Sequence, residues 1–271
     1  MPSSLPRWCI VIPCHNEERA IGGVLASAQR LGVPICVVDD GSTDATAKIV
    51  ARHAGVTLLR HQGRHGKGEA LRTGLRAARQ SGFEAVLTMD GDGQHQADDV
   101  PYMLAAAKRH PGSVVIGARL LDTERQPRAR HIANRVADWG ISWACARGIA
   151  DTQSGQRWYP PSVLELADTA TTNGFAYEAS LLIRACRESG VDVVSIPIPS
   201  RYGAQFRHSH FRPLLDVARI TCATTMHLLS YGKLRESYRL ARERQACVEH
   251  HRVRIAADGA HLSTGLPGGF G

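Results

Sequence analysis

The sequence lacks long apolar runs. No stretch of about 18 consecutive apolar residues occurs in the 271-residue chain, so we expect no segment that spans a bilayer by itself. The first residues also lack the apolar core of a secretory signal. We therefore expect a cytoplasmic protein whose contact with a membrane is peripheral.

Paired cysteines and aromatic residues are also scarce. The seven cysteines form no CxxC pair, which argues against a disulfide framework or a zinc site. Aromatic residues make up 6% of the chain, few for stacking on nucleic-acid bases, and no RNP-like strand or zinc-finger spacing occurs. A basic nucleic-acid-binding protein is the alternative from another functional class, and we expect no nucleic acid as a partner.

Positive charge exceeds negative charge, and the excess is concentrated. The formal net charge is +8, and residues 201–254 hold eleven Lys and Arg against four Asp and Glu. Such a segment is typical of a surface that meets phosphates, although a solvated helix face has the same composition.

Short runs rich in Val and Ile alternate with helical patterns in most of the chain. The runs are residues 8–12, 35–38, 56–59, 84–89, 114–116 and 191–196. Apolar runs of this kind predict an α/β fold with a mostly parallel sheet that helices cover on both faces. We expect one domain over residues 1–210, a helical segment over 211–254 and a disordered tail over 255–271.

Polar clusters follow three of these runs. They begin at Pro13, at Asp39 and at Asp90. Ligands of open α/β sheets bind beyond the carboxyl ends of the strands, so these clusters predict a binding site there.

Asp90 and Asp92 are two residues apart, which places both carboxylates on one side of an extended chain. A hard divalent cation fits such a pair, and Mg²⁺ completes its shell with substrate phosphates. The spacing excludes an EF-hand, and an Asp-Gly turn is the structural alternative.

Residues 63–68 form a glycine-rich loop that enters a helix, with Lys67 and Arg72 close by. The loop lacks the spacing of a Walker A motif, so we reject a P-loop NTPase. It is either an anion site at a helix N-terminus or a tight turn.

Seven segments in order carry a resemblance to a known family. They are VIPCHNEE, VVDDGSTDAT, GKGEALRTG, MDGDGQH, DTQSGQR, GFAYEASLLIRA and SHFRPLLDVARI. Together they resemble family 2 glycosyltransferases of the GT-A fold, in particular the polyprenyl-phosphate mannosyl- and glucosyltransferases. The resemblance covers about residues 8 to 220 and implies a Rossmann-like, mostly parallel sheet flanked by helices, with C-terminal amphipathic helices.

The resemblance also implies roles for individual residues. The donor would contact Pro13, Glu17, Asp39, Asp40, Lys67, Arg72, Asp90 and Gly91, and the metal would be held by Asp90, Asp92 and Gln94. The catalytic residues would be Asp92, Arg119, Asp151 and Arg157, and the acceptor phosphate would meet Arg119, Arg128, Arg130, Ser154 and Arg157. Gln156 departs from the family pattern, which has Phe in this segment.

The resemblance implies an inverting transfer of a hexose, with Mg²⁺ or Mn²⁺, from GDP-mannose or UDP-glucose to a polyprenyl phosphate. The alternative is a hydroxyl acceptor in a glycolipid or polysaccharide, which needs a general base, for which Asp151 is the candidate. An ionised phosphate needs cations instead, and the arginines favour it.

The C-terminal segment fits a membrane surface. Leu234, Tyr238 and Ala241 recur at helical spacing, and Arg235, Arg239 and Arg242 follow one position later. This pattern predicts an amphipathic helix at the inner face of the membrane. Residues 214–231 could instead pack on the domain or pair with a second subunit.

Overall fold

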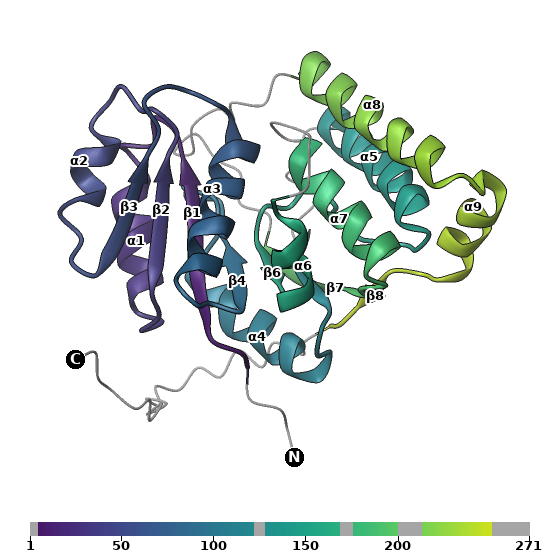
Figure 1. The fold of residues 1–271 in the computed structure, drawn as a ribbon, viewed down its shortest axis with the longest axis horizontal. Coiled ribbons are helices and arrows are strands. Elements are labelled where there is room, and N and C mark those ends of the chain that lie inside the picture. The colour runs from purple at the N-terminus through teal and green to yellow at the C-terminus, as the bar shows by residue number, and fades with distance from the viewer. Residues whose placement is uncertain (1–4, 122–127, 169–175, 200–212, 251–271) are drawn as a thin grey trace.

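The computed structural model describes residues 5–121, 128–168, 176–199 and 213–250 (Figure 1). One eight-stranded sheet has the order β3-β2-β1-β4-β6-β5-β7-β8. The strands are β1 (Trp8–Cys14), β2 (Ile35–Asp39), β3 (Val56–Arg60), β4 (Ala85–Thr88), β5 (Val114–Leu121), β6 (Arg157–Tyr159), β7 (Val193–Pro199) and β8 (Cys247–Val248). Strand β6 runs antiparallel to β4 and β5, and the other pairs are parallel.

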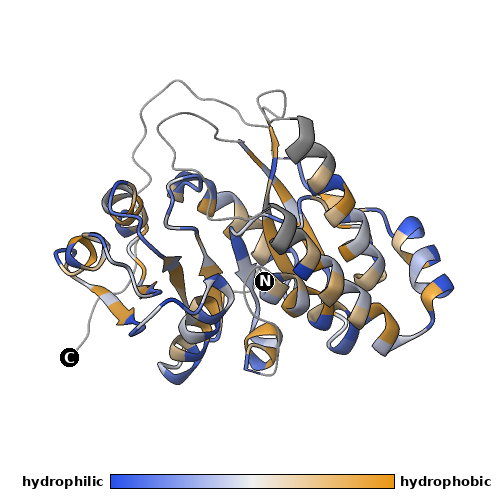
Figure 2. Cartoon of the chain, turned by 90° about the horizontal axis from the view of Figure 1, so that it is seen from above, coloured by the Kyte–Doolittle hydropathy of each residue, from blue (hydrophilic) through white to orange (hydrophobic). Residues whose placement is uncertain are grey.

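Helices cover both faces of the sheet. They are α1 (Ile21–Gln29), α2 (Thr46–Val50), α3 (Lys67–Gln80), the 3₁₀ turn η1 (Ala97–Asp99), α4 (Val100–Arg109), α5 (Arg128–Cys145), α6 (Pro161–Leu166), α7 (Ala176–Glu188), α8 (Pro213–Tyr231) and α9 (Leu234–Glu243). Figure 2 shows mostly hydrophobic strands between helices that carry both hydrophilic and hydrophobic residues.

Strand β1 is buried on both faces, which explains its continuous apolar sequence. Cys9 and Val11 belong to the core beneath α3 and α7, whereas Ile10 and Ile12 belong to the opposite core with α1 and α4. Alternate side chains of a strand point to opposite faces, so a strand buried on both faces needs an unbroken apolar run. The expected mostly parallel α/β sheet is confirmed.

The structure adds features that the expected pattern did not contain. Strands β6 and β8 have three and two residues, and the expected helical segment, 211–254, contains two helices, α8 and α9, with strand β8 after them. Gly232 and Lys233 separate the two helices, both with left-handed backbone (φ of 63° and 51°). A left-handed residue ends an α-helix, so the chain turns there. The expected tail, 255–271, lies outside the described residues.

The C-terminal helices pack on the domain. Helix α8 lies on α5 and α7, and α9 lies against α5 (Figure 1). The indole Nε1–H of Trp143 in α5 donates to the carbonyl of Leu234 at 2.9 Å. Across the described ranges, no helix has both the length and the apolar character to cross a bilayer.

Candidate active site

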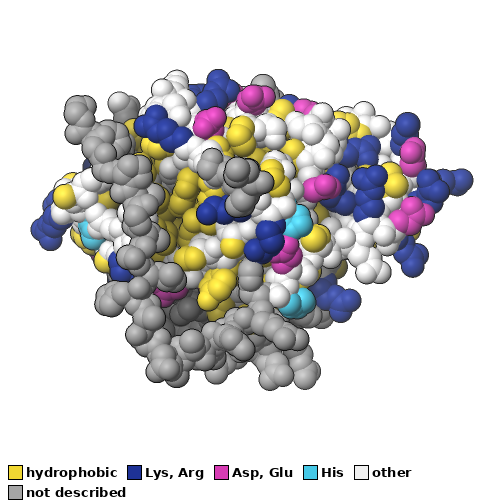
Figure 3. All heavy atoms as spheres, turned by 90° about the horizontal axis from the view of Figure 1, so that it is seen from below, with side chains coloured by type: hydrophobic (Ala, Val, Ile, Leu, Met, Phe, Trp, Pro, Cys, Tyr) yellow, Lys and Arg dark blue, Asp and Glu magenta, His cyan; other side chains and the backbone are white. Residues whose placement is uncertain are grey.

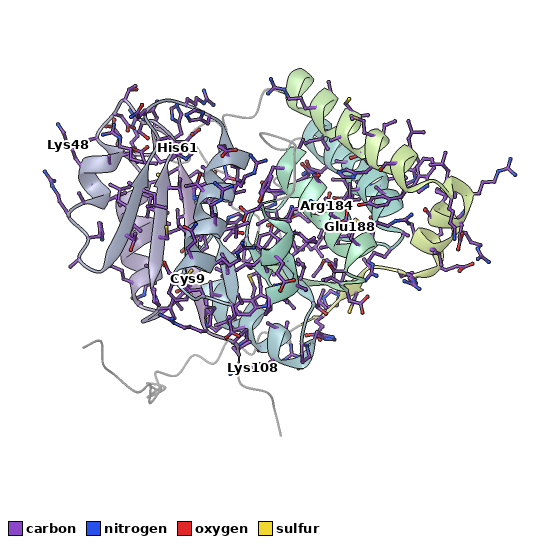
Figure 4. All side chains as sticks on the ribbon, viewed as in Figure 1. Cys9, Lys48, His61, Lys108, Arg184 and Glu188 are labelled. Atoms are coloured by element: carbon purple, nitrogen blue, oxygen red, sulfur yellow. The ribbon has the colours of Figure 1, made fainter. Side chains whose placement is uncertain are left out.

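The ends of β1 and β2 interlock at the carboxyl edge of the sheet. Cys14 pairs with Asp39 in parallel register. Asn16, in a left-handed conformation, donates its backbone N–H to Ser42 Oγ at 2.8 Å and accepts the Thr43 N–H at 2.8 Å. Figure 4 shows His61, which follows β3, at this edge, and Cys9 near the opposite end of β1.

Asp39 is completely buried at this edge. Its Oδ1 accepts the Ser42 N–H at 2.9 Å, and its Oδ2 lies 3.1 Å from Arg60 Nε. That Oδ2 has no hydrogen bond of good geometry among the described residues. A buried carboxylate oxygen left in this state fits a site that a ligand hydroxyl completes.

Asp40 ties the glycine-rich loop to the end of β2. Its carboxylate accepts the backbone N–H groups of His65 and Gly66 at 2.9 and 2.7 Å and lies 2.8 Å from His61 Nδ1. Burial raises the pKa of Asp40, but these hydrogen bonds outweigh it and lower that pKa below its usual value. Asp40 therefore holds the loop as a structural anion.

Gly41 allows the loop to approach. Its φ is +68°, and a β-carbon there would lie 2.5 Å from the carbonyl carbon of Gly63. Glycine is therefore required both for the backbone conformation and for the space. The loop leads into α3, whose first residue is Lys67.

Lys67 joins three of the sequence motifs. Its Nζ lies 2.7 Å from Asp90 Oδ1 and 3.1 Å from Glu178 Oε2 at the start of α7. A β-carbon on Gly155 would lie 2.6 and 2.7 Å from the two Asp90 oxygens and 2.8 Å from Lys67 Nζ. The segment 151–157 therefore covers this ion pair directly, and its glycine leaves the necessary room.

The charged side chains of this cluster shift one another's pKa values. Burial opposes ionisation of both Lys67 and Asp90, yet their attraction raises the pKa of Lys67 and lowers the pKa of Asp90. Burial and the neighbouring Asp90 raise the pKa of Asp92. Asp92 Oδ1 accepts the Gln94 backbone N–H at 2.9 Å. His95, buried beneath the turn, accepts the Asp90 N–H through Nδ1 at 3.2 Å.

The carboxylates of Asp90 and Asp92 fit a hard divalent cation. Within the described parts of the chain, no group of three or more His, Cys, Asp or Glu side chains is arranged to hold a metal. Two carboxylates are the usual protein share of a Mg²⁺ site that substrate phosphates complete. The electrostatic conflict between Asp90 and Asp92 is the feature that a bound cation would relieve.

Arg119 and Asp151 form a tightly held pair beside this cluster. The Nε and one Nη of Arg119 donate to the two Asp151 oxygens at 2.8 and 2.7 Å, and the Arg119 backbone N–H donates at 2.7 Å. Burial alone would raise the pKa of Asp151, but Arg119 lowers it below its usual value. Asp151 has a positive φ of 50°, so the chain turns sharply where this pair forms.

The predicted acceptor residues divide into two groups. Arg157 is 1% exposed, and its guanidinium donates to the carbonyls of Thr152, Ser154 and Glu178. Ser154 is also buried and donates to the Gly117 carbonyl at 2.6 Å. In this structure both residues hold the 151–157 turn and present no surface to an acceptor. Arg128 and Arg130 lie in the first turn of α5, and their side chains are outside the described part.

Other predicted donor residues occupy varied positions. Glu17 is buried, and its backbone N–H donates to Thr46 Oγ1 at 2.7 Å. Pro13 is in β1 opposite Val38, and a β-carbon on Gly91 would lie 3.4 Å from the Pro13 carbonyl oxygen. Arg72 pairs with Glu69 and lies over the Tyr177 ring.

Sequence reasoning did not single out Glu178 or Asp138. Glu178 interrupts the apolar sequence of α7, which is a weak signal for a buried charge. Asp138 of α5 accepts the backbone N–H and hydroxyl of Thr152 at 2.7 and 2.6 Å. Burial, with a contribution from Asp151, raises the pKa of Asp138 to about 6.

The family model "Glycosyl transferase family 2" matches residues 9–161, which include the ends of β1 and β2, the Asp90 turn and Arg119. The chain belongs to glycosyltransferase family 2. It is an enzyme of the hexosyltransferase kind, as the sequence motifs predicted.

Curated relatives cover most of the chain. It is 26% identical to UDP-N-acetylglucosamine–dolichyl-phosphate N-acetylglucosaminyltransferase of Methanococcus voltae, over 71% of this chain and 85% of that protein. It is 26% identical to polyprenol monophosphomannose synthase of Mycolicibacterium smegmatis (71% and 76%) and 27% identical to undecaprenyl-phosphate mannosyltransferase of Micrococcus luteus (71% and 82%). The resemblance to this group of transferases is confirmed.

Solved structures support the GT-A fold. Glucosyl-3-phosphoglycerate synthase of Mycobacterium tuberculosis, in complex with Mn²⁺ and UDP, superposes with a TM-score of 0.62 at 23% identity, covering 83% of this chain and 79% of that one. Mannosyl-3-phosphoglycerate synthase of Rubrobacter xylanophilus gives a TM-score of 0.60 at 20% identity (94% and 79%). At these identities the likeness establishes the fold.

Proposed function

We propose that this glycosyltransferase moves a hexose from a nucleotide sugar, GDP-mannose or UDP-glucose, to a polyprenyl phosphate with inversion at the anomeric carbon. The names of two curated relatives specify dolichyl phosphate and undecaprenyl phosphate, and the third relative is a polyprenol monophosphomannose synthase. The observation that carries the choice of a phosphate acceptor is the Arg119–Asp151 pair.

A hydroxyl acceptor needs a base that takes its proton. Asp151, the candidate for this role, accepts three hydrogen bonds from Arg119 and has a lowered pKa, because burial is outweighed by the attraction of Arg119. Both features make it a weak base. A phosphate monoester is already ionised at neutral pH and needs no base. The geometry therefore favours the phosphate.

The donor would lie along the carboxyl edge of β1, β2 and β4. Pro13, Glu17 and Asp39 would contact the nucleoside. Asp39 Oδ2 lies 3.1 Å from Arg60 Nε but accepts no hydrogen bond of good geometry among the described residues, so it is suited to accept a ribose hydroxyl. The diphosphate would lie at the N-terminus of α3, near Lys67 and Arg72. Asp90, Asp92 and Gln94 would hold Mg²⁺ or Mn²⁺, which when bound offsets the charge of the leaving diphosphate.

In the reaction, an oxygen of the acceptor phosphate attacks the anomeric carbon from the face opposite the nucleoside diphosphate. The new C–O bond forms as the bond to the diphosphate breaks, and the electron pair leaves with the β-phosphate. No proton is transferred. Lys67 and Arg119 stabilise the charged groups on either side, so catalysis consists mainly of positioning and electrostatics.

The α5 and α9 helices offer a surface for the membrane. Trp139 is 54% exposed, its ring lies 5.4 Å from that of Trp143, and the Trp143 ring lies 5.5 Å from Tyr238 of α9. Arg235 and Arg242 stand three residues before and four residues after Tyr238 in α9, and Figure 3 shows Lys and Arg, interspersed with Asp and Glu, at this end of the molecule. Aromatic and basic side chains together suit an anionic headgroup layer, which we place at the inner face of the membrane.

Vesicles test this surface. Trp139→Ser with Tyr238→Ser should weaken binding to vesicles that contain anionic lipid, whereas Tyr102→Ser, which removes an exposed tyrosine from α4, should not. If the wild type, the Trp139→Ser/Tyr238→Ser variant and the Tyr102→Ser variant bind these vesicles equally, the assignment of the surface is wrong.

The acceptor is tested with two matched lipids. The purified protein receives GDP-mannose or UDP-glucose with Mg²⁺ or Mn²⁺ and either a short polyprenyl phosphate or the same polyprenol without its phosphate. We expect sugar transfer to the phosphate and none to the alcohol. Transfer to the alcohol at a comparable rate would replace this proposal with the hydroxyl-acceptor alternative.

A further inference from the structure

The cluster around Lys67 places an internal cation directly on a proposed metal ligand. The Lys67 ammonium lies 2.7 Å from Asp90 Oδ1, and a divalent cation bound to Asp90 would be attracted by the same carboxylate. Two cations bound to one carboxylate repel each other, so the attraction of each cation to the site is weaker when the other is present. Lys67 and the metal ion are therefore competitors for Asp90.

Glu178 supplies Lys67 with a second partner. Its Oε2 lies 3.1 Å from the ammonium, and its side chain is 9% exposed. Glu178 Oε1 has no hydrogen-bond partner among the residues that the structure describes. Glu178 comes from α7, whereas Asp90 follows β4, so the two carboxylates hold the ammonium from different elements.

The surroundings limit where the ammonium can go. Gly155 covers the pair so closely that a β-carbon would reach both Asp90 and Lys67. Lys67 is also the first residue of α3, whose N-terminal cap Gly66 has a φ of 98° and no side-chain cap. A lysine at a helix N-terminus is well placed to meet a phosphate that binds there.

We propose that Lys67 is an exchangeable counter-cation: it neutralises Asp90 while the site is empty of metal and moves to the donor diphosphate when the metal ion binds, with Glu178 as its fixed anchor. The inference rests on the proposed function for its ligands. Glu178 acts through Lys67 and is therefore a positioning residue.

The exchange predicts effects of opposite sign in one variant. Lys67→Met removes the competitor, so the affinity for Mn²⁺ alone should rise about tenfold, the size of one charged hydrogen bond. The same variant should bind UDP or GDP in the presence of Mn²⁺ more weakly than the wild type, because a phosphate contact is lost. Mn²⁺ binding is followed by electron paramagnetic resonance of the free ion, and nucleotide binding by calorimetry.

A matched control separates exchange from a general change of charge. Arg76→Met removes one positive charge further along α3, where the partner is Asp168 rather than Asp90. It should leave the affinity for Mn²⁺ alone within about twofold of the wild type. If the affinity for Mn²⁺ rises equally in both variants, the effect comes from the general change of charge and the proposed exchange is wrong.

Glu178→Gln tests the anchor. Loss of the Glu178 charge leaves Lys67 with Asp90 as its charged partner, so Mn²⁺ alone should bind more weakly than in the wild type, and UDP or GDP with Mn²⁺ should do so as well. The proposal is overturned if Lys67→Met leaves Mn²⁺ affinity unchanged, if it weakens both ligands, or if Glu178→Gln changes neither. These measurements need no sugar transfer, so a failure of the proposed reaction would be recognised separately, in the acceptor assay.

Discussion

Asp138 makes the stability of the protein depend on pH in a way that one substitution can reveal. Its carboxyl accepts two hydrogen bonds from Thr152 and lies near Asp151, and its pKa is raised from 3.8 to about 6, mainly by burial. The folded chain therefore holds this proton more tightly than the unfolded chain does. Stability from this group is present below about pH 4 and is lost as the pH rises through 6.

The size of the effect follows from the pKa. Each pKa unit corresponds to about 1.4 kcal/mol, so the full cost of ionising Asp138 in the folded state is about 3 kcal/mol. At pH 5 about half of this cost is already present, and at pH 7.5 nearly all of it. Asp138→Asn removes the titration but keeps an amide oxygen that can accept from Thr152. Relative to the wild type, the variant should therefore gain about 1.5 kcal/mol between pH 5 and pH 7.5.

Urea unfolding at the two pH values measures this difference. Any constant cost of the asparagine cancels, because the same substitution is compared at both pH values, and other titrating groups cancel because both proteins carry them. Asp98→Asn, at a side chain that is 71% exposed and paired with Arg30, is the control and should show a change below about 0.5 kcal/mol. If the Asp138 difference is the same at both pH values, the burial argument is wrong.

Three further substitutions have matched controls. Gly41→Ala and its control Gly32→Ala both place alanine in a left-handed conformation, at a cost of about 1–2 kcal/mol. At Gly41 the added β-carbon would also clash with the Gly63 backbone. The unfolding free energy of Gly41→Ala should therefore fall further than that of Gly32→Ala, and its donor binding should weaken. Gly155→Ala should displace Asp90 and Lys67 and lower transfer activity at least about tenfold, whereas Gly23→Ala, with open space in α1, should leave transfer activity unchanged and add stability. Arg157→Ala should cost about 3 kcal/mol or more in denaturant unfolding, because it leaves three buried carbonyls without a donor at about 1–3 kcal/mol each. Arg76→Ala, at a half-exposed ion pair with Asp168, should cost less than about 1 kcal/mol. If a control variant loses as much stability or activity as the variant that it is matched to, the contact proposed for that variant is wrong.

The sheet was predictable where its strands are long enough to show a pattern. Strand β1 is buried on both faces, and the unbroken apolar sequence that this requires is visible without a structure. Strand β6 has the sequence RWY, which is too short to show a period, and its antiparallel direction depends on how 151–157 folds back between β4 and β5. That return is set by tertiary contacts such as the Ser154 hydrogen bond to Gly117, which no local pattern encodes.

The position of the candidate site at the carboxyl edge of the sheet was predictable for the same topological reason. Parallel strands end together, so Asp39 and Asp90 had to lie at one edge. The direction of an arginine was not predictable, because its long side chain can reach solvent or a buried carbonyl with equal ease. Arg157 was expected at the acceptor, and the structure instead buries it among backbone carbonyls. Its role at an acceptor stays a prediction that this arrangement does not favour.

Lys67 and Arg119 are both paired with carboxylates within the protein. Lys67 is held between Asp90 and Glu178, and Arg119 is held by Asp151, so each is neutralised before any substrate arrives. Burying these cations without partners would cost several kcal/mol each, which explains the carboxylates. We expect the same pairing to weaken the binding of free phosphate, because an incoming anion must compete with a carboxylate that already holds the cation. A ligand that brings its own divalent cation can satisfy Asp90 and release Lys67, and a bare phosphate cannot. The resting ion pairs therefore make the binding of donor and metal interdependent, which is the coupling that the Lys67 and Glu178 variants measure.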